Sequence, residues 1–180
     1  MPQEQAHASF GPSATTTTVE FAALPCHAVI HSSWSLKVPL ISDTLPHPLR
    51  SIHIMGIAGT AMASLAGMLK DSGFEVTGSD KAIYPPMSTY LERLNIPVME
   101  GFNAENLSFG PDLVVVGNVI RAIYDEAVAL QSSEIPYCSF PQLLGQLFLK
   151  DAHSIVVAGT HGKTTTTSIA AWLIESAGMN

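Results

Sequence analysis

The stretch SIHIMGIAGTAMASLAGMLKDSGFEVTGSD, residues 51–80, decides the fold class of this chain of 180 residues. It opens with an apolar run of strand length, Ser51–Ile57, and passes into Thr60–Ser72, where apolar side chains recur with the period of a helix. A second run of strand length follows at Glu75–Ser79. Strand, helix and strand in this order predict a βαβ unit, whose two strands run parallel.

The alternation of strands and helices continues to the end of the chain, which predicts an α/β fold with a parallel sheet. The prolines of Tyr84-Pro85-Pro86 fit neither a strand nor the interior of a helix, so we expect a connection there. The further strands are expected at Pro97–Glu100, Leu113–Gly117, Pro136–Ser139 and Ser154–Ala158, and the further helices at Met87–Leu94, Glu126–Ser132, Pro141–Leu149 and Thr164–Ala177.

Residues 1–48 lack this alternation, because Ser, Thr, Pro and Ala dominate them without a sustained period. We expect them to form a low-complexity, disordered leader. The domains predicted from the sequence are therefore this leader at 1–48, a sheet domain at 49–150 and, at 151–180, the truncated start of a second domain.

Composition limits the classes of function. With 8 Lys and Arg against 15 Asp and Glu, the formal net charge is −7 and no basic stripe appears, so we expect neither nucleic acid nor a membrane as partner. No apolar run approaches the ~20 residues that span a bilayer, and no secretory signal precedes Lys37, so a cytoplasmic protein is expected. Cys26 and Cys138 belong to no ligand-spaced cluster, which is typical of a reducing compartment.

The first glycine turn, MGIAG, joins the first predicted strand to the first predicted helix. Glycine at 56 and 59 permits a tight turn and close approach of a ligand, while free N–H groups at a helix start favour a pyrophosphate. Asp80 ends the next strand, where dinucleotide-binding folds place an acceptor for sugar hydroxyls. Because Ala58 and Ala61 replace glycines of the GxGxxG pattern, these residues fit a nucleotide-type ligand and a ligand-free tight turn equally, and do not support a nicotinamide enzyme.

The second glycine turn, GTHGKTT at Gly159–Thr165, follows a predicted buried strand and opens a helix, as a P-loop does. Such a loop surrounds phosphate oxygens with N–H groups, while Lys163 reaches the β- and γ-phosphates and Thr164 can ligate Mg²⁺. Val157 stands where the strict pattern GxxxxGK[ST] needs glycine, so this loop is a shorter variant. The turn predicts phosphate binding.

Together, GIAGTAM after the first strand, TGSD after the second and AGTHGKTTT after a later one resemble the Mur ligase family over about residues 50–180. These ATP-dependent enzymes add amino acids or peptides to UDP-N-acetylmuramate in bacterial cell-wall synthesis. The resemblance implies a Rossmann-like domain for the UDP-sugar, followed by the first strand and helix of a P-loop ATPase domain. It also implies that the muramyl carboxylate is activated as an acyl phosphate, which an amine attacks to form an amide.

The resemblance further implies roles for individual residues. The UDP-sugar would be bound by Gly56, Ile57, Ala58, Gly59, Thr60, Ala61, Met62, Ser79, Asp80 and Asn118. ATP would be bound by Gly159, Thr160, His161, Gly162, Lys163, Thr164 and Thr165. Lys163 and Thr164 would be catalytic, because they stabilise the transferring phosphoryl group and hold Mg²⁺.

Within the family, YPPMST at Tyr84–Thr89, GTAM at Gly59–Met62 and the pair Gly117-Asn118 look most like members that join UDP-N-acetylmuramate to L-alanyl-γ-D-glutamyl-meso-diaminopimelate in cell-wall recycling. Members that add L-alanine are the alternative, and a non-catalytic UDP-sugar-binding module is an alternative of another class. The chain departs from the family pattern at Ala122-Ile123-Tyr124, where a Gly-Asn-Pro or Asp-Asn-Pro turn is usual. Because the family's downstream catalytic residues and amine-binding domain are not among these residues, we expect no ligase turnover from them alone.

Overall fold

The computed structural model describes residues 45–179, and the leader predicted at 1–48 lies almost entirely outside these residues. At the start of the described part, Leu45 and Leu49 pack, partly buried, against the hydrophobic core. The packed structure thus includes the residues that lead into the first strand.

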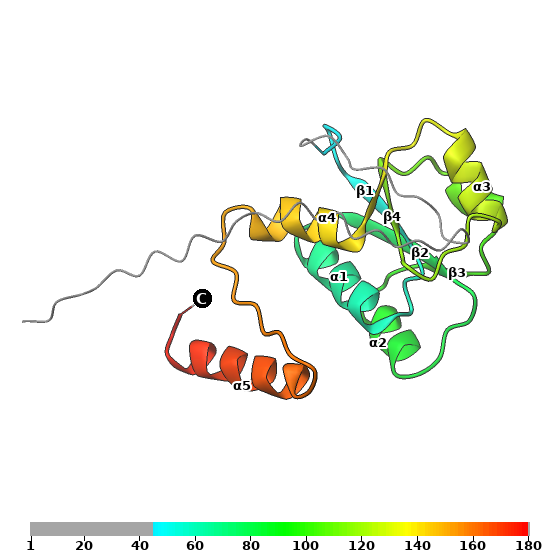
Figure 1. The fold of residues 1–180 in the computed structure, drawn as a ribbon. Coiled ribbons are helices and arrows are strands. Elements are labelled where there is room, and N and C mark those ends of the chain that lie inside the picture. The colour runs from blue at the N-terminus through cyan, green and yellow to red at the C-terminus, as the bar shows by residue number, and fades with distance from the viewer. Residues whose placement is uncertain (1–44, 180) are drawn as a thin grey trace, which may run out of the picture. The chain divides into compact units, whose positions relative to one another are not determined.

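Within the described residues, five parallel strands form one sheet, which confirms the α/β fold class (Figure 1). The strands are β1 (Ser51–Met55), β2 (Glu75–Asp80), β3 (Val98–Glu100), β4 (Leu113–Val116) and β5 (Tyr137–Ser139), in the spatial order β3-β2-β1-β4-β5. The chain moves outward from β1 to β3 and then returns to the other side of β1. The order therefore reverses between β1 and β4, and open α/β sheets bind ligands at such a switch point.

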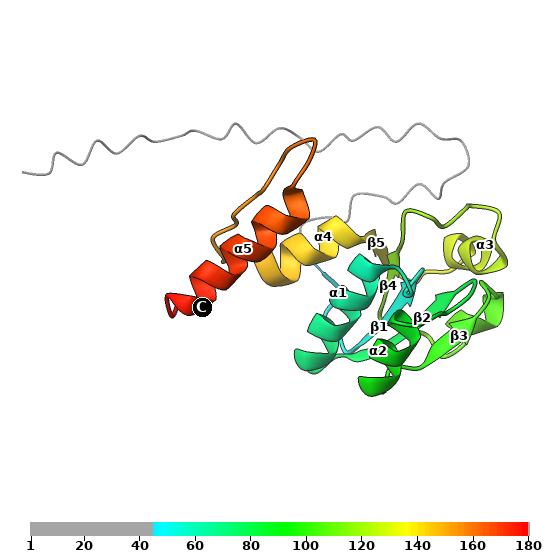
Figure 2. The ribbon, with the colours of Figure 1, turned by 90° about the horizontal axis from the view of Figure 1, so that it is seen from below.

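Helices cover both faces of this sheet (Figures 1 and 2). One face is covered by α1 (Thr60–Asp71), α2 (Met87–Arg93) and α4 (Phe140–Leu144). The other carries the 3₁₀ turn η1 (Ala104–Leu107) and α3 (Asp125–Ser132). The helix expected at Pro141–Leu149 is present, but it passes from α4 into a π-helical turn, η2 (Gly145–Leu149).

Alternating side chains of β1 divide the interior into two cores. Ile52 and Ile54 are fully buried on the α1 face, whereas His53 and Met55 face α3. Full burial of one such aliphatic side chain stabilises the fold by ~1.5–3 kcal/mol. All four side chains of β4 are buried, as the continuous apolar run Leu113–Val116 predicts for a strand covered on both faces.

The segment after η2 differs from the sequence prediction. The last helix forms as expected, as α5 (Lys163–Ser176), but the strand predicted at Ser154–Ala158 is absent from the structure. A strand requires a neighbour to satisfy its N–H and C=O groups, and the described residues place no strand beside this segment. Ile155 and Val156 are 69% and 83% exposed. The apolar run therefore indicated a burial that the described residues do not provide.

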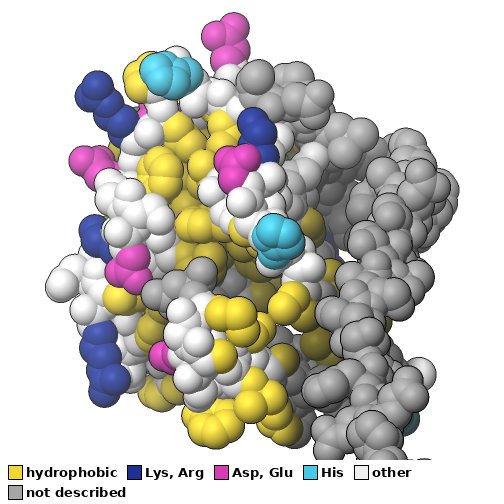
Figure 3. All heavy atoms as spheres, turned by 90° about the vertical axis from the view of Figure 1, so that its left-hand side faces the viewer, with side chains coloured by type: hydrophobic (Ala, Val, Ile, Leu, Met, Phe, Trp, Pro, Cys, Tyr) yellow, Lys and Arg dark blue, Asp and Glu magenta, His cyan; other side chains and the backbone are white. Residues whose placement is uncertain are grey.

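Charged groups at the surface and one cysteine in the core can be described for the residues of the structure. On the face drawn in Figure 3, Lys, Arg, Asp and Glu side chains lie interspersed among polar and hydrophobic ones. No helix in the described part combines the length and the apolar character needed to cross a membrane. Cys138 is a fully buried, free thiol whose pKa is raised by burial to about 12, so it is a neutral core residue. Cys26 lies outside the described residues.

Candidate functional site

A cavity of about 440 Å³ opens at the carboxyl ends of β1, β2 and β4, where the strand order reverses. Its volume lies in the range of ~300–1,000 Å³ that is typical of small-molecule sites. The cavity is lined by six of the ten residues that the sequence assigned to the UDP-sugar, namely Gly56, Ala58, Gly59, Met62, Asp80 and Asn118. The structure thus brings together residues from three strand ends that lie far apart in the sequence.

The turn after β1 is held by the neighbouring strand. Gly56 has φ +84°, a conformation that favours glycine, and its N–H donates to the carbonyl oxygen of Ser79 at 2.8 Å. The N–H of Ile57 donates to the same carbonyl at 3.1 Å. The chain then enters α1, which has no side-chain N-cap, so the first-turn N–H groups from Thr60 to Met62 are available to an anion.

Asp80 is the last residue of β2 and lines the cavity next to the loop that leads into this helix. Its Oδ2 accepts the N–H of Ala58 at 2.8 Å, and its Oδ1 accepts the N–H of Lys81 at 2.7 Å. An ionised carboxylate has about four acceptor positions, so Asp80 retains capacity for ligand hydroxyl groups. Because a carboxylate repels phosphate, ligand hydroxyl groups fit at Asp80, whereas an anion fits at the free N–H groups of α1.

The other four residues assigned to the UDP-sugar do not line the cavity. Ile57 and Ser79 are fully buried, and the Ser79 hydroxyl donates to Glu126 at 3.0 Å. Thr60 and Ala61 are exposed in the first turn of α1. The side chains of these four residues therefore do not line the cavity. In the first turn of α1, a ligand would contact the backbone N–H groups.

Sequence reasoning missed the apolar wall of the cavity. This wall consists of Ala82, Tyr84, Pro85, Pro86, Met87 and Val119, with Gly117 beside it. The sequence predicts a connection at Tyr84-Pro85-Pro86 and a helix from Met87, and it gives no signal that this connection lies at the strand ends. Tyr84 lines the cavity although its side chain is 70% exposed.

Gly117 explains how β4 can end beneath the cavity. A Cβ atom at this position would lie 2.8 Å from the carbonyl oxygen of Met55 on β1, closer than real Cβ contacts. The Gly117 N–H donates to that same carbonyl at 3.0 Å. Glycine therefore lets β1 and β4 remain paired to their last residues, and the next residue, Asn118, emerges at the cavity.

In the second glycine turn, the side-chain hydrogen bonds join residues that lie within four positions of each other in the sequence. Gly162 has φ +75°, and the Lys163 ammonium turns back to donate to the carbonyl oxygens of Gly159 at 2.8 Å and Thr160 at 3.4 Å. His161 Nδ1 lies 3.2 Å from the Thr160 hydroxyl oxygen. Among the later threonines, Thr167 donates to the carbonyl of Lys163 at 2.8 Å, which is a backbone role.

This turn fits a bound nucleotide triphosphate with Mg²⁺. The N-terminus of α5 lacks a side-chain cap and begins with the exposed Lys163, an arrangement that is electrostatically unfavourable unless an anion joins it. The Lys163 ammonium lies within the loop whose N–H groups would surround phosphate, so it could exchange carbonyl oxygens for phosphate oxygens. Thr164 follows at the position that ligates Mg²⁺ in a P-loop, and its hydroxyl makes no hydrogen bond to other described residues.

Known proteins that are similar to this chain are Mur ligases. A family model described as "Mur ligase family, catalytic domain" matches residues 51–151. The UDP-N-acetylmuramate–L-alanyl-gamma-D-glutamyl-meso-2,6-diaminoheptandioate ligase of Escherichia coli is 46% identical over 127 residues, covering 71% of this chain and 28% of that protein. The chain therefore spans less than a third of the length of this curated relative.

Solved structures and a second class of relatives match the same region. The crystal structure of UDP-N-acetylmuramate:L-alanyl-gamma-D-glutamyl-meso-diaminopimelate ligase from Neisseria meningitides superimposes with a TM-score of 0.70 at 49% identity, over 72% of this chain and 40% of that one. The UDP-N-acetylmuramate–L-alanine ligase of Aromatoleum aromaticum is 38% identical over 136 residues, covering 76% of this chain and 28% of that protein.

Proposed function

Because the chain belongs to the Mur ligase family, we propose that its sheet domain at 49–150 binds UDP-N-acetylmuramate in the cavity beside Gly56. The observation that carries this proposal is the cavity at the switch point, which combines an uncapped helix N-terminus with the carboxylate of Asp80. A diphosphate needs the first feature, and sugar hydroxyls need the second.

In this proposal the ligand lies across the ends of three strands. The diphosphate accepts hydrogen bonds from N–H groups between Thr60 and Met62, at the positive end of the helix dipole. Asp80 accepts hydroxyl groups at the nucleoside end, and the apolar wall at Tyr84–Met87 packs against the base. Asn118 contacts the sugar on the side of β4.

For the second turn, we propose that residues 151–180 begin an ATP-binding domain. Gly159–Thr165 would hold ATP, and Thr164 would ligate Mg²⁺. When bound, ATP supplies the phosphoryl group that activates a carboxylate for amide formation. Lys163 holds the oxygens of this group and stabilises the negative charge that develops on them during transfer.

For the whole protein, we propose a cytoplasmic ligase that joins UDP-N-acetylmuramate to L-alanyl-γ-D-glutamyl-meso-diaminopimelate in peptidoglycan recycling. Support comes from the relatives named for this reaction, which are 46% and 49% identical. The relative named for L-alanine addition, at 38% identity, supports the alternative less strongly.

The reaction is tested on this chain joined to the part of the Escherichia coli relative that lies beyond the matched 127 residues. With UDP-N-acetylmuramate, ATP and Mg²⁺, the tripeptide should give an amide product, ADP and phosphate. The joined part supplies the amine-binding domain, so this experiment tests whether these residues serve as the UDP-sugar- and ATP-binding part of such a ligase, and absence of product would contradict that role. The 180 residues by themselves should give no amide product, and any product would contradict their description as one part of the enzyme.

A further inference from the structure

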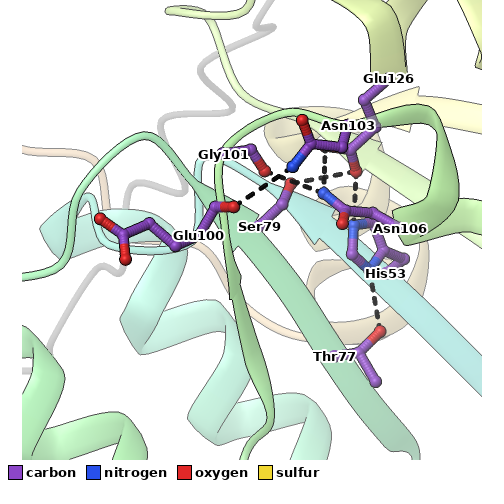
Figure 4. A network of polar contacts seen from close by, with 8 residues as sticks. All are labelled: His53, Thr77, Ser79, Glu100, Gly101, Asn103, Asn106 and Glu126. Atoms are coloured by element: carbon purple, nitrogen blue, oxygen red, sulfur yellow. Dashed lines mark hydrogen bonds and ion pairs between the residues drawn. The ribbon is translucent and has the colours of Figure 1, made fainter.

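A buried polar network lies on the α3 face of the sheet and includes Ser79, whose neighbour Asp80 lines the cavity (Figure 4). Its centre is Glu126, the second residue of α3, whose side chain is fully buried. Oε1 accepts from His53 Nε2 at 2.7 Å and from the Ser79 hydroxyl at 3.0 Å, while Oε2 accepts from the Asn106 amide at 3.0 Å. Burial of a carboxylate is costly unless donors surround it, and these three donors satisfy both oxygens.

One arm of this network leads through Ser79 to the glycine turn. The Ser79 side chain points to Glu126, and its backbone carbonyl accepts the N–H groups of Gly56 and Ile57. Ser79 is thus fixed from behind by a carboxylate while it holds the turn in front. If its side chain lost the partner, the carbonyl that orients both N–H groups would gain freedom.

A second arm leads through Asn106 to Asp80. The Asn106 amide donates to Glu126 Oε2 and to the carbonyl oxygen of Gly101 at 2.9 Å. The N–H of Gly101 in turn donates to the backbone carbonyl of Asp80 at 2.8 Å. This arm therefore ends at the residue whose carboxylate lines the cavity and holds the N–H of Ala58.

A third arm leads away from the cavity. His53 Nδ1 lies 2.8 Å from the hydroxyl oxygen of Thr77, which is its partner in the register of β1 and β2. Thr77 lies two residues before Ser79 on β2, toward the amino end of the strand, and it does not line the cavity. It shares the network with the other arms but gives no support to the turn.

We propose that Glu126 is a positioning residue for the ligand cavity, because it fixes Ser79 and the Asn106–Gly101 pair, which in turn fix the Gly56 turn and Asp80. It touches no ligand itself. The inference rests on the proposed function, in which this cavity binds UDP-N-acetylmuramate. According to this inference, Glu126 on α3 affects the affinity of the cavity at the strand ends, although it does not line that cavity.

Two substitutions separate the arms. Ser79→Ala removes the first arm and leaves the backbone carbonyl in place. Glu126→Gln keeps the shape and one acceptor oxygen for His53 and Ser79, but it places an amide donor against the amide donor of Asn106, which breaks the second arm. Thr77→Val is the matched control, because it removes a hydroxyl from the same network on the arm that leaves the cavity.

The first measurement is calorimetric titration of each variant with UDP-N-acetylmuramate. Ser79→Ala and Glu126→Gln should raise the Kd about five- to tenfold, the size expected when one ordering hydrogen bond is lost. Thr77→Val should lower the melting temperature to a similar extent with an unchanged Kd. Unchanged affinity in both cavity-arm variants, or an equal loss in Thr77→Val, would overturn the proposal and leave the network a general stabiliser.

The second measurement needs no ligand, so it separates this inference from the proposed function. Amide hydrogen exchange should be faster at Gly56 and Ile57 in Ser79→Ala, and at Gly101 and Ala58 in Glu126→Gln, than in the parent chain. It should be unchanged at all four amides in Thr77→Val. If the parent chain fails to bind UDP-N-acetylmuramate, the proposed ligand is wrong and exchange still decides the role of Glu126. Exchange at parent rates in both cavity-arm variants would refute it.

Discussion

The turns at Gly56 and Gly162 follow the same pattern in the sequence, yet their partners come from different distances along the chain. Ala58 in the first turn is held by Asp80, 22 residues away, and the apolar wall comes from still other elements. Lys163 in the second turn is held by Gly159, four residues away. The cavity at the first turn is thus formed by residues from neighbouring strands and loops. The conformation of the second turn is set by residues of the same loop.

Burial distinguishes the two regions as clearly as hydrogen bonding does. β1, which leads into the first turn, is paired on both sides and buried from Ile52 to Met55. The segment before the second turn has no strand neighbour among the described residues, and α5 has no buried side chain among them. The stability of the two turns should therefore respond very differently to equivalent changes.

The largest difference is expected from removing an aliphatic side chain in each region. Ile54→Ala should lower the free energy of unfolding by about 3 kcal/mol, because Ile54 is fully buried and leaves a cavity. Ile169→Ala on α5, at a side chain that is 55% exposed, should change it by less than about 0.5 kcal/mol. Urea unfolding of the two variants measures both values, and comparable losses would contradict the distinction.

Substitution of either turn glycine should change the stability less than Ile54→Ala does, and each substitution should weaken the binding of a different ligand. Gly56→Ala and Gly162→Ala each place a Cβ at positive φ, +84° and +75°, which costs about 1–2 kcal/mol locally. The first should weaken UDP-N-acetylmuramate and spare ATP, and the second should do the reverse. Titration of each variant with both ligands checks this. Weakening of both ligands by one substitution would mean that the turns are not separate sites.

A third prediction concerns the amino ends of β1 and β4, at the end of the strands that lies away from the cavity. The N–H groups of Ser51 and Arg50 and the Ser51 hydroxyl donate to Asp112 at 2.9–3.0 Å, and these bonds hold the pKa of Asp112 below its usual 3.8. Because the folded pKa is lowered, the stabilisation is present above pH 3.8 and is lost as pH falls through the folded value.

Asp112→Asn should therefore be less stable than the parent chain at pH 7, and the two should converge as the pH is lowered below 3.8. Urea unfolding at a series of pH values measures the difference. Affinity for UDP-N-acetylmuramate at pH 7 should not change, since Asp112 does not line the cavity. A stability difference that is independent of pH would refute the ionic origin.

The smallest change in stability is expected at Lys163. This side chain is exposed and bonds only to two carbonyls of its own loop among the described residues, so Lys163→Met should change the free energy of unfolding by less than about 0.5 kcal/mol. The same substitution should abolish measurable ATP binding while UDP-N-acetylmuramate binding persists. Retained ATP affinity would remove the main argument for a phosphate-binding turn.

The sequence predicted well what depends on local pattern. The periods of residues 51–80 defined β1, α1 and β2 to within two residues, because one buried face imposes a regular spacing of apolar side chains. Gly56, Gly59 and Asp80, which the sequence singled out, line one cavity because the parallel strands that precede them end at the same edge of the sheet. The strand expected at Ser154–Ala158 failed for the converse reason, since an apolar run indicates burial only where neighbours cover it.

The rest of the site depends on contacts that no local pattern encodes. His53 and Glu126 meet at 2.7 Å although 73 residues separate them, and neither was predicted to interact. The available signal was a histidine at an inward-facing position of an otherwise apolar strand, which requires a buried partner. Nothing in its spacing identifies that partner as Glu126. The apolar wall likewise depends on how the Pro85-Pro86 connection folds over the strand ends.

The central claim is that the Gly56 cavity binds a UDP-sugar, and calorimetric titration of the 180-residue chain with UDP-N-acetylmuramate tests it most directly. We expect one bound molecule per chain, an affinity that Gly56→Ala lowers and Lys163→Met leaves unchanged, and no binding of reduced nicotinamide dinucleotide. Absence of detectable heat with UDP-N-acetylmuramate, or equal affinity in Gly56→Ala, would contradict the assignment of the cavity.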